Sequence, residues 1–211
     1  DFGLHLLVYA EGVSVRFHQD DSKLPKKHQL LVTFDDGTSL CSTVSMYGGL
    51  WCWEAKAVEN PYYQQACEKP SPLAEAFDGK YFNGIAGAPD VQAKSAKALL
   101  ATEQRFPGLG NGVVQDILFA AGIHPRRKVN TCGTAERRKL HRAIRRVLAD
   151  MVKRGGRDTE KDLFGQPGGD VTKLSRLTVG EACPKCGTVI QKQNYLGGSV
   201  YFCETCQPLE Q

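Results

Sequence analysis

Four of the eight cysteines occur as two closely spaced pairs near the end of the 211-residue sequence. Cys183 and Cys186 form one pair, Cys203 and Cys206 form the other, and 16 residues separate the pairs. This spacing is typical of thiolates that bind one metal ion. Four thiolates in tetrahedral geometry leave no open coordination position, so the sequence predicts one structural Zn²⁺. Two disulfides and an iron–sulfur cluster are the alternatives.

A glycine-rich turn followed by asparagine lies in the middle of the chain. Gly108, Gly110 and Asn111 follow a proline, and an apolar helical pattern begins directly after them. The free amides at a helix N-terminus point toward an anion, and glycines let the backbone approach it closely. The turn therefore predicts a phosphate-binding site in which Asn111 is the N-cap. A simple connection between two capped helices is the alternative.

The cationic residues concentrate in the second half of the chain. Residues 1–91 contain 7 Lys and Arg against 12 Asp and Glu, and residues 92–211 contain 20 against 11. The halves thus carry net charges of −5 and +9, which predicts that the second half meets a polyanion such as nucleic acid. A solvated basic helix face is the alternative. Hydrophobic residues make up 41%, and no run approaches the roughly 18 apolar residues of a membrane span.

Local patterns predict the elements that position these residues. Short runs of β-branched and aromatic residues predict strands at 4–9, 12–17, 29–34, 38–45 and 50–53. A connection punctuated by prolines is expected over 54–73. Helical patterns cover 91–102, 111–122 and 134–154, the last with Thr134 as its cap and one strongly basic side. Short strands expected at 188–190 and 200–202 form a hairpin between the cysteine pairs, with its turn at 194–198.

The order of these features resembles the formamidopyrimidine-DNA glycosylase / endonuclease VIII family of base-excision repair enzymes. The turn at 108–111, the segment Asp116–Pro125, the connection Ser71-Pro72-Leu73 and the terminal cysteine hairpin carry the resemblance. It implies an α+β fold: a partial N-terminal antiparallel β-sandwich over 1–70, a helical helix–two-turn–helix domain over 71–174, and a four-cysteine zinc-ribbon hairpin over 175–211.

The resemblance also implies a function. We expect a DNA glycosylase and AP lyase that binds damaged double-stranded DNA and needs no obligate protein partner. The expected location is the cytoplasm, or the nucleoid in a bacterium, and the expected cofactor is one structural Zn²⁺. The residues that the resemblance or their charge assigns to DNA binding are Asn111, Lys97, Gly108, Gly110, Arg126, Arg127 and Gly198. Met46 or Tyr47 is expected to be a wedge in the duplex or to pack in a turn.

Three departures from the family pattern accompany the resemblance. The family uses an N-terminal proline amine followed by glutamate, whereas this chain begins with Asp1-Phe2, so we expect no catalytic residue in it and no activity of the chain as it stands. The family's sandwich lysine is absent, and Lys56 does not replace it. Gly197 and Gly198 replace the arginine of the family's hairpin turn. The alternatives are a non-catalytic zinc-containing relative that recognises bent or damaged duplex, and a zinc ribbon that binds proteins.

Overall fold

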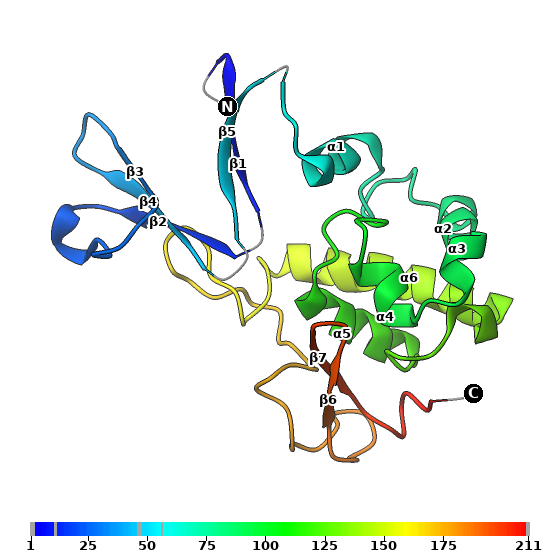
Figure 1. Ribbon diagram of the computed structural model, residues 1–211. Coiled ribbons are helices and arrows are strands. Elements are labelled where there is room, and N and C mark those ends of the chain that lie inside the picture. Colours follow the sequence, from blue (N-terminus) through cyan, green and yellow to red (C-terminus); the bar gives the residue numbers. More distant parts are fainter. Residues whose placement is uncertain (1–2, 11, 46–47, 56, 210–211) are drawn as a thin grey trace. The chain divides into compact units, whose positions relative to one another are not determined.

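The computed structural model describes residues 3–10, 12–45, 48–55 and 57–209 (Figure 1). It forms two compact units, one made by residues within 1–64 and 156–169 and the other by 65–155 and 170–211. Helices α2 to α6, within residues 79–153, and the cysteine hairpin belong to the same unit, so the three domains inferred from the sequence stay a prediction. No helix in the described ranges is long and apolar enough to cross a membrane.

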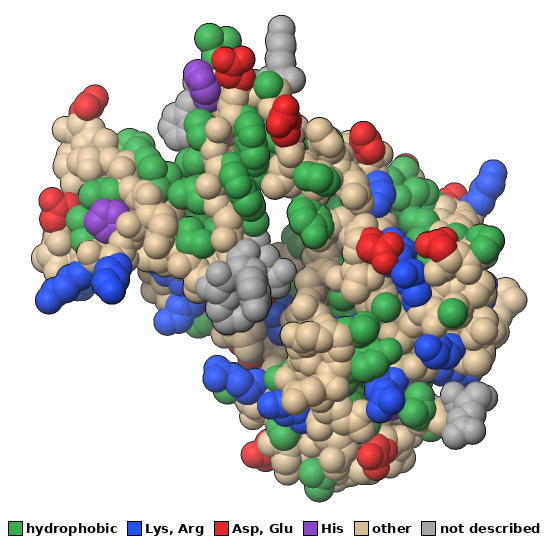
Figure 2. Space-filling view, viewed as in Figure 1, with side chains coloured by type: hydrophobic (Ala, Val, Ile, Leu, Met, Phe, Trp, Pro, Cys, Tyr) green, Lys and Arg blue, Asp and Glu red, His purple; other side chains and the backbone are tan. Residues whose placement is uncertain are grey.

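The first unit is built from two antiparallel sheets, and all five expected strands are confirmed. One sheet pairs β1 (His5–Tyr9) with β5 (Leu50–Glu54). The other has the order β2-β4-β3, with bounds Val13–His18 for β2, Leu30–Thr33 for β3 and Ser39–Val44 for β4. A short 3₁₀ turn, Asp21–Lys23, follows β2. Figure 2 shows hydrophobic side chains gathered on the surface over β1 and β5, where Trp51 stacks on Trp53.

The segment 156–169 packs against β2 in this unit, although the sequence predicted it within the helical domain. The backbone amide of Phe17 donates to the carbonyl of Leu163 at 2.8 Å, and an Arg16 guanidinium nitrogen donates to the carbonyl of Asp162 at 2.9 Å. The ring of Phe164 contacts Phe17 edge to face. These contacts join residues nearly 150 positions apart, which no local pattern indicates.

The second unit is helical. Its helices are α1 (Pro61–Glu68, which begins in the first unit), α2 (Gly79–Ala86), α3 (Pro89–Gln92), α4 (Ala96–Ala101), α5 (Asn111–Ala121) and α6 (Thr134–Lys153), with a 3₁₀ turn at Val129–Thr131. The connection expected over 54–73 therefore contains α1, and α2 was not expected. Phe77 is fully buried at the centre of the core, where its ring contacts Phe82, Phe106 and His141.

Three expectations about helix ends were wrong. The helix expected over 91–102 is divided into α3 and α4, because the Ser95 hydroxyl accepts from the amide of Ala98 and starts a new helix. Gly110, not Asn111, is the N-cap of α5, and Gly133, not Thr134, is the N-cap of α6. Glycine adopts the extended conformation that an N-cap needs as readily as the polar residues do.

The chain ends in a two-stranded hairpin of β6 (Gln191–Tyr195) and β7 (Gly198–Phe202). Leu196 and Gly197 join the strands with φ angles of 52° and 69°, both left-handed, as a tight hairpin turn requires. The hairpin is confirmed, but its first strand lies after the 188–190 range that the sequence predicted. Residues 188–190 instead run beside Ala182, which forms a single bridge with Val189.

Candidate nucleic-acid interface and metal centre

The four paired cysteines converge beside the open end of the β6–β7 hairpin, and their Sγ atoms all lie within 4.8 Å of one another. The Sγ atoms of Cys183 and Cys206 are 3.9 Å apart, and those of Cys186 and Cys203 are 3.4 Å apart. Thiolates about 2.3 Å from one tetrahedral ion lie about 3.8 Å from each other, whereas disulfide sulfurs are about 2 Å apart. The four side chains fit a single four-coordinate metal ion, and all four are free thiols.

The surroundings of these thiols favour a bound cation. Hydrogen bonds from Thr188 lower the pKa of Cys186 to about 6. Burial raises the pKa of Cys203 and raises that of Cys206 to about 12. Four thiols this close ionise together only when a cation offsets their repulsion and desolvation. The donor set is sulfur alone, which suits Zn²⁺ better than Mg²⁺ or Ca²⁺.

The glycine-rich turn leaves the start of α5 open. Gly108 has a φ of +84°, a conformation that favours glycine, and it brings the chain into the helix with Gly108, Gly110 and Asn111 all exposed. No side chain caps the helix at Gly110. Within the described ranges, the amides of Asn111 and Gly112 have no acceptor. These two donors and the positive end of the helix dipole are available to an anion.

Lys97 on α4 is buried beside the hairpin turn. Its side chain is 2% exposed, and its Nζ donates to the carbonyl of Tyr195 at 2.8 Å. No carboxylate of the described residues pairs with it, and burial lowers the pKa of this lysine. A Cβ added at Gly198 would lie 3.7 Å from Nζ. Because Gly198 has no side chain, nothing at this position covers the Lys97 ammonium group, which is buried without a counter-charge.

Gln115 on α5 joins the hairpin to the same helix that begins at the glycine-rich turn. Its Nε2 donates to the carbonyls of Asn111 at 3.0 Å and Ser199 at 3.3 Å, and its Oε1 accepts from the amide of Tyr201 at 3.2 Å. The carbonyl of Ser199 and the amide of Tyr201 point away from β6. The side-chain amide of Gln115 therefore forms the hydrogen bonds that a third strand would form at the free edge of β7. Gln115 and Lys97 thus hold the turn of the hairpin close to the start of α5.

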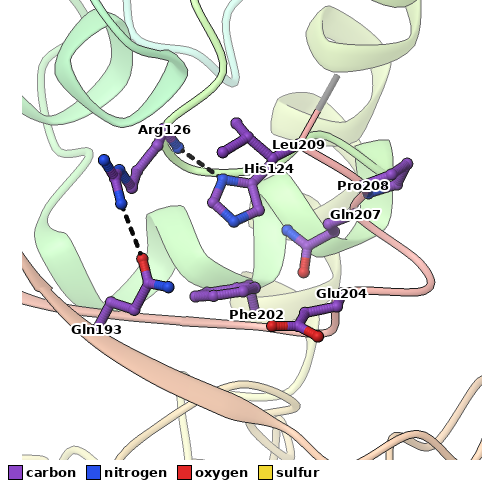
Figure 3. A pocket seen from close by; sticks show the side chains of 8 residues that line it. All are labelled: His124, Arg126, Gln193, Phe202, Glu204, Gln207, Pro208 and Leu209. Atoms are coloured by element: carbon purple, nitrogen blue, oxygen red, sulfur yellow. Dashed lines mark hydrogen bonds between the residues drawn. The ribbon is translucent and has the colours of Figure 1, made fainter. Parts of the chain in front are cut away.

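Arg126 lies at the rim of a pocket of about 310 Å³ between the 123–126 loop and the hairpin (Figure 3). Its guanidinium is exposed, lies 5.5 Å from the centre of the Tyr195 ring, and donates to Gln193 at 3.3 Å. Its backbone amide donates to Nδ1 of His124, which packs edge to face on Phe202. Burial, and then the charge of Arg126, lower the pKa of His124 to about 4. His124 is consequently neutral at neutral pH and supports the loop.

Arg127 lies in different surroundings from its neighbour Arg126, although the sequence assigned both to DNA. Its guanidinium is buried and makes two hydrogen bonds with the Glu136 carboxylate, at 2.6 and 3.0 Å. It also donates to the carbonyl of Thr131. Glu136 in turn accepts from the Gly133 amide at the start of α6. These contacts give Arg127 a structural role at the start of α6, and nothing in its surroundings supports a contact with DNA.

The structure also contains supporting residues that sequence reasoning missed. Asp116 is buried on α5 and accepts from the amides of Lys173 and Leu174, which fixes the chain that leads to the hairpin. Gln207 is fully buried, accepts from the Cys203 amide and donates to the carbonyl of Ile123. The only signal in the sequence was a polar residue on the apolar side of a helix, at Asp116. The residues Met46, Tyr47 and Lys56 lie outside the described residues.

Comparison with known proteins identifies the family. A family model described as "Formamidopyrimidine-DNA glycosylase H2TH domain" matches residues 69–162. The formamidopyrimidine-DNA glycosylase of Thermus thermophilus is 34% identical over 143 residues, which are 65% of this chain and 52% of that protein. The enzyme of the same name from Shigella dysenteriae is 32% identical over 87% of this chain and 68% of its own length. The chain thus spans about half the length of the first of these relatives.

Solved structures of similar proteins have the same fold. The MutM (Fpg) protein from Thermus thermophilus superposes with a TM-score of 0.81 at 27% identity, over 100% of this chain and 78% of its own. The Lactococcus lactis Fpg, in a complex with DNA that contains an abasic site, superposes with a TM-score of 0.80 at 26% identity, over 97% and 75%. The helical domain, the hairpin with its four clustered cysteines and these similarities agree: the chain belongs to the formamidopyrimidine-DNA glycosylase family.

Proposed function

We propose that this chain binds damaged double-stranded DNA as the DNA-holding part of a base-excision repair glycosylase with AP lyase activity. The family and the Lactococcus lactis complex with abasic DNA support this proposal. Such a protein works where the DNA is, in the cytoplasm or on the nucleoid of a bacterium, and needs no protein partner to bind its substrate.

The proposed contact is with the phosphates of one DNA strand. The amides of Asn111 and Gly112 and the Asn111 side chain donate to one phosphate at the start of α5. Lys97 offers its remaining N–H groups past Gly198 to the neighbouring phosphate, and the exposed Arg126 adds a second cation at the edge of the hairpin. Gly198 lets the DNA backbone approach closely. Arg127 is left out, since Glu136 already binds its guanidinium.

Zn²⁺ is the metal that we propose for the four cysteines. When bound, it cross-links the two ends of the hairpin and supplies no Lewis-acid chemistry, since the protein fills all four positions. The cysteines then hold β6 and β7 in place, and Gln115 and Lys97 hold the hairpin against α4 and α5. The metal would therefore act on DNA affinity through the position of the turn.

The observation that carries the proposal is that a cation without a counter-charge, Lys97, lies close to the free backbone amides at the start of α5. A 2% exposed lysine has no carboxylate partner in the described residues, and the helix that starts nearby has two free amides. A buried cation without a counter-charge is unfavourable unless an anion arrives. A phosphate supplies that charge and accepts from all of these donors.

Fluorescence anisotropy with a duplex that contains an abasic site tests this interface. Asn111→Ala and Lys97→Met should each weaken binding by about 5- to 100-fold, on the scale of about 1–3 kcal/mol for a hydrogen bond to a charged group. Lys97→Met should also lower the salt dependence by about one phosphate contact. Asn83→Ala, an exposed asparagine on α2, is the matched control and should bind like the wild type. Equal affinity of Asn111→Ala and Asn83→Ala would refute the interface.

The glycosylase and lyase activities need a separate test on the whole protein. Borohydride trapping on the same abasic duplex should give a covalent protein–DNA adduct, because an amine nucleophile forms an imine with the opened sugar. No adduct, together with unchanged binding in the anisotropy assay, would refute the activity and favour a relative that binds damaged DNA without cleaving it.

A further inference from the structure

Helix α6 carries two rows of basic side chains with different surroundings. The inner row, Arg137, His141 and Arg145, faces the rest of the unit. Arg137 donates to the carbonyls of Cys132 and Val129, and both His141 and Arg145 bond to the carbonyl of Phe77. The hydrogen bonds of these three side chains to backbone carbonyls outside α6 hold the helix in place.

The outer row is exposed and has no such partners. It consists of Arg138, Lys139, Arg142, Arg146 and Lys153. None of these side chains makes a hydrogen bond or an ion pair with any residue that the structure describes. At about 100° per residue, the five positions fall within an arc about 100° wide, along roughly 22 Å of the helix. They therefore form one straight cationic stripe, which we call the outer row.

This row differs from an ordinary solvated helix face. Exposed helices usually place acidic residues four positions from basic ones, and each such pair adds about 0.2–0.5 kcal/mol. From Arg137 to Ala149 the sequence contains no Asp or Glu, and Asp150, four positions after Arg146, is the one acidic residue between Arg138 and Lys153. Arg138, Arg142 and Arg146 instead repeat at four-residue intervals, so like charges face each other at each turn. The row repels itself, and a polyanion that lies along it would relieve that repulsion.

We propose that the outer row binds the sugar–phosphate backbone of a second DNA duplex segment, separate from the one at the start of α5. A straight stripe of five cations matches the regular line of negative charge that a duplex presents, and guanidinium groups suit phosphates. The row begins far from the glycine-rich turn: Nζ of Lys139 lies 3.3 Å from an added Cβ on Gly122, just past the opposite end of α5 from Asn111. One protein molecule can then hold two duplex segments.

Counting the duplexes bound per protein tests the proposal. The probe is an undamaged duplex of about ten base pairs, which is as long as α6 at 3.4 Å per pair. In sedimentation velocity with excess duplex at low salt, the wild-type chain should bind two. The triple variant Arg138→Gln, Arg142→Gln, Arg146→Gln should bind one. The control triple Lys27→Gln, Lys80→Gln, Arg176→Gln removes the same charge from exposed residues elsewhere and should still bind two.

Each outcome decides the matter. A single duplex on the wild type that the outer-row triple variant still binds, or equal binding by the two triple variants, would overturn the proposal, and so would displacement of the second duplex by a poly-glutamate peptide of equal charge. Asn111→Ala should weaken binding of the other duplex and leave binding of the one on the outer row unchanged. The interface at the start of α5 is judged by that variant alone, so its failure is distinguishable from failure of the outer row. Far-ultraviolet circular dichroism confirms that each variant is folded.

Discussion

Replacing Gln115 with methionine should loosen the hairpin without changing the volume of the side chain. In the wild type, this side-chain amide accepts from the Tyr201 amide and donates to the carbonyl of Ser199, both on the free edge of β7. Methionine fills a similar space and has no hydrogen-bonding group that can replace the amide. The substitution therefore leaves two backbone groups at the contact with α5 without a protein partner.

The structure sets the size of the effect. An unsatisfied buried backbone group costs about 1–3 kcal/mol. Ser199 and Tyr201 are only partly buried, so the loss of each hydrogen bond should lower the free energy of unfolding by about 1–2 kcal/mol. The free energy of unfolding should fall by about 2–4 kcal/mol for the two together. The affinity for abasic duplex should fall at least fivefold as well, because only the bond from Lys97 to Tyr195 then holds the turn in place.

Urea denaturation followed by circular dichroism measures the first quantity, and anisotropy measures the second. Gln19→Met is the matched control, since Gln19 is exposed and its side chain makes no hydrogen bond to the described residues; it should change stability by less than about 0.5 kcal/mol. If Gln115→Met unfolds at the same urea concentration as Gln19→Met, the assigned role of Gln115 is wrong.

Two further predictions concern protons and metal. The pKa of His124 is about 4 in the fold and about 6.5 when unfolded, so the unfolded chain binds the proton first as the pH falls. The free energy of unfolding should therefore decrease between pH 6.5 and 4, by on the order of 3 kcal/mol, and His124→Asn should flatten this dependence; equal slopes in urea titrations would contradict it. Removing the metal with a chelator should lower the melting temperature and weaken duplex binding at the start of α5, and adding Zn²⁺ should restore both. Unchanged melting after complete metal removal would show that the cysteines play no such role.

Features encoded within a short stretch of sequence could be predicted. Two residues between paired cysteines are enough to bring two thiolates to one ion, and the clustering of all four Sγ atoms agrees with that spacing. The five strands were recognisable from alternating β-branched residues and turn signals. Gly122 was expected to end the helix before it, and it does so in the left-handed conformation.

Features that depend on distant contacts could not be predicted. The bond of Lys97 to Tyr195 joins residues 98 positions apart, and Gln115 reaches residues 84 and 86 positions away. Arg126 and Arg127 are adjacent and chemically identical, yet one is exposed and the other binds a carboxylate inside the protein. The path of the loop decides which of the two arginines faces solvent, and no local pattern in the sequence encodes that path.

The most direct test of the proposed interface is the response of individual backbone amides to DNA. Two-dimensional ¹H–¹⁵N NMR of the zinc-loaded chain, titrated with a duplex containing an abasic site, reports on each amide separately. The largest shifts should occur at Gly110, Asn111 and Gly112 and at Gly197 and Gly198. Unshifted amides at both places, with shifts confined to other parts of the chain, would contradict the proposed site.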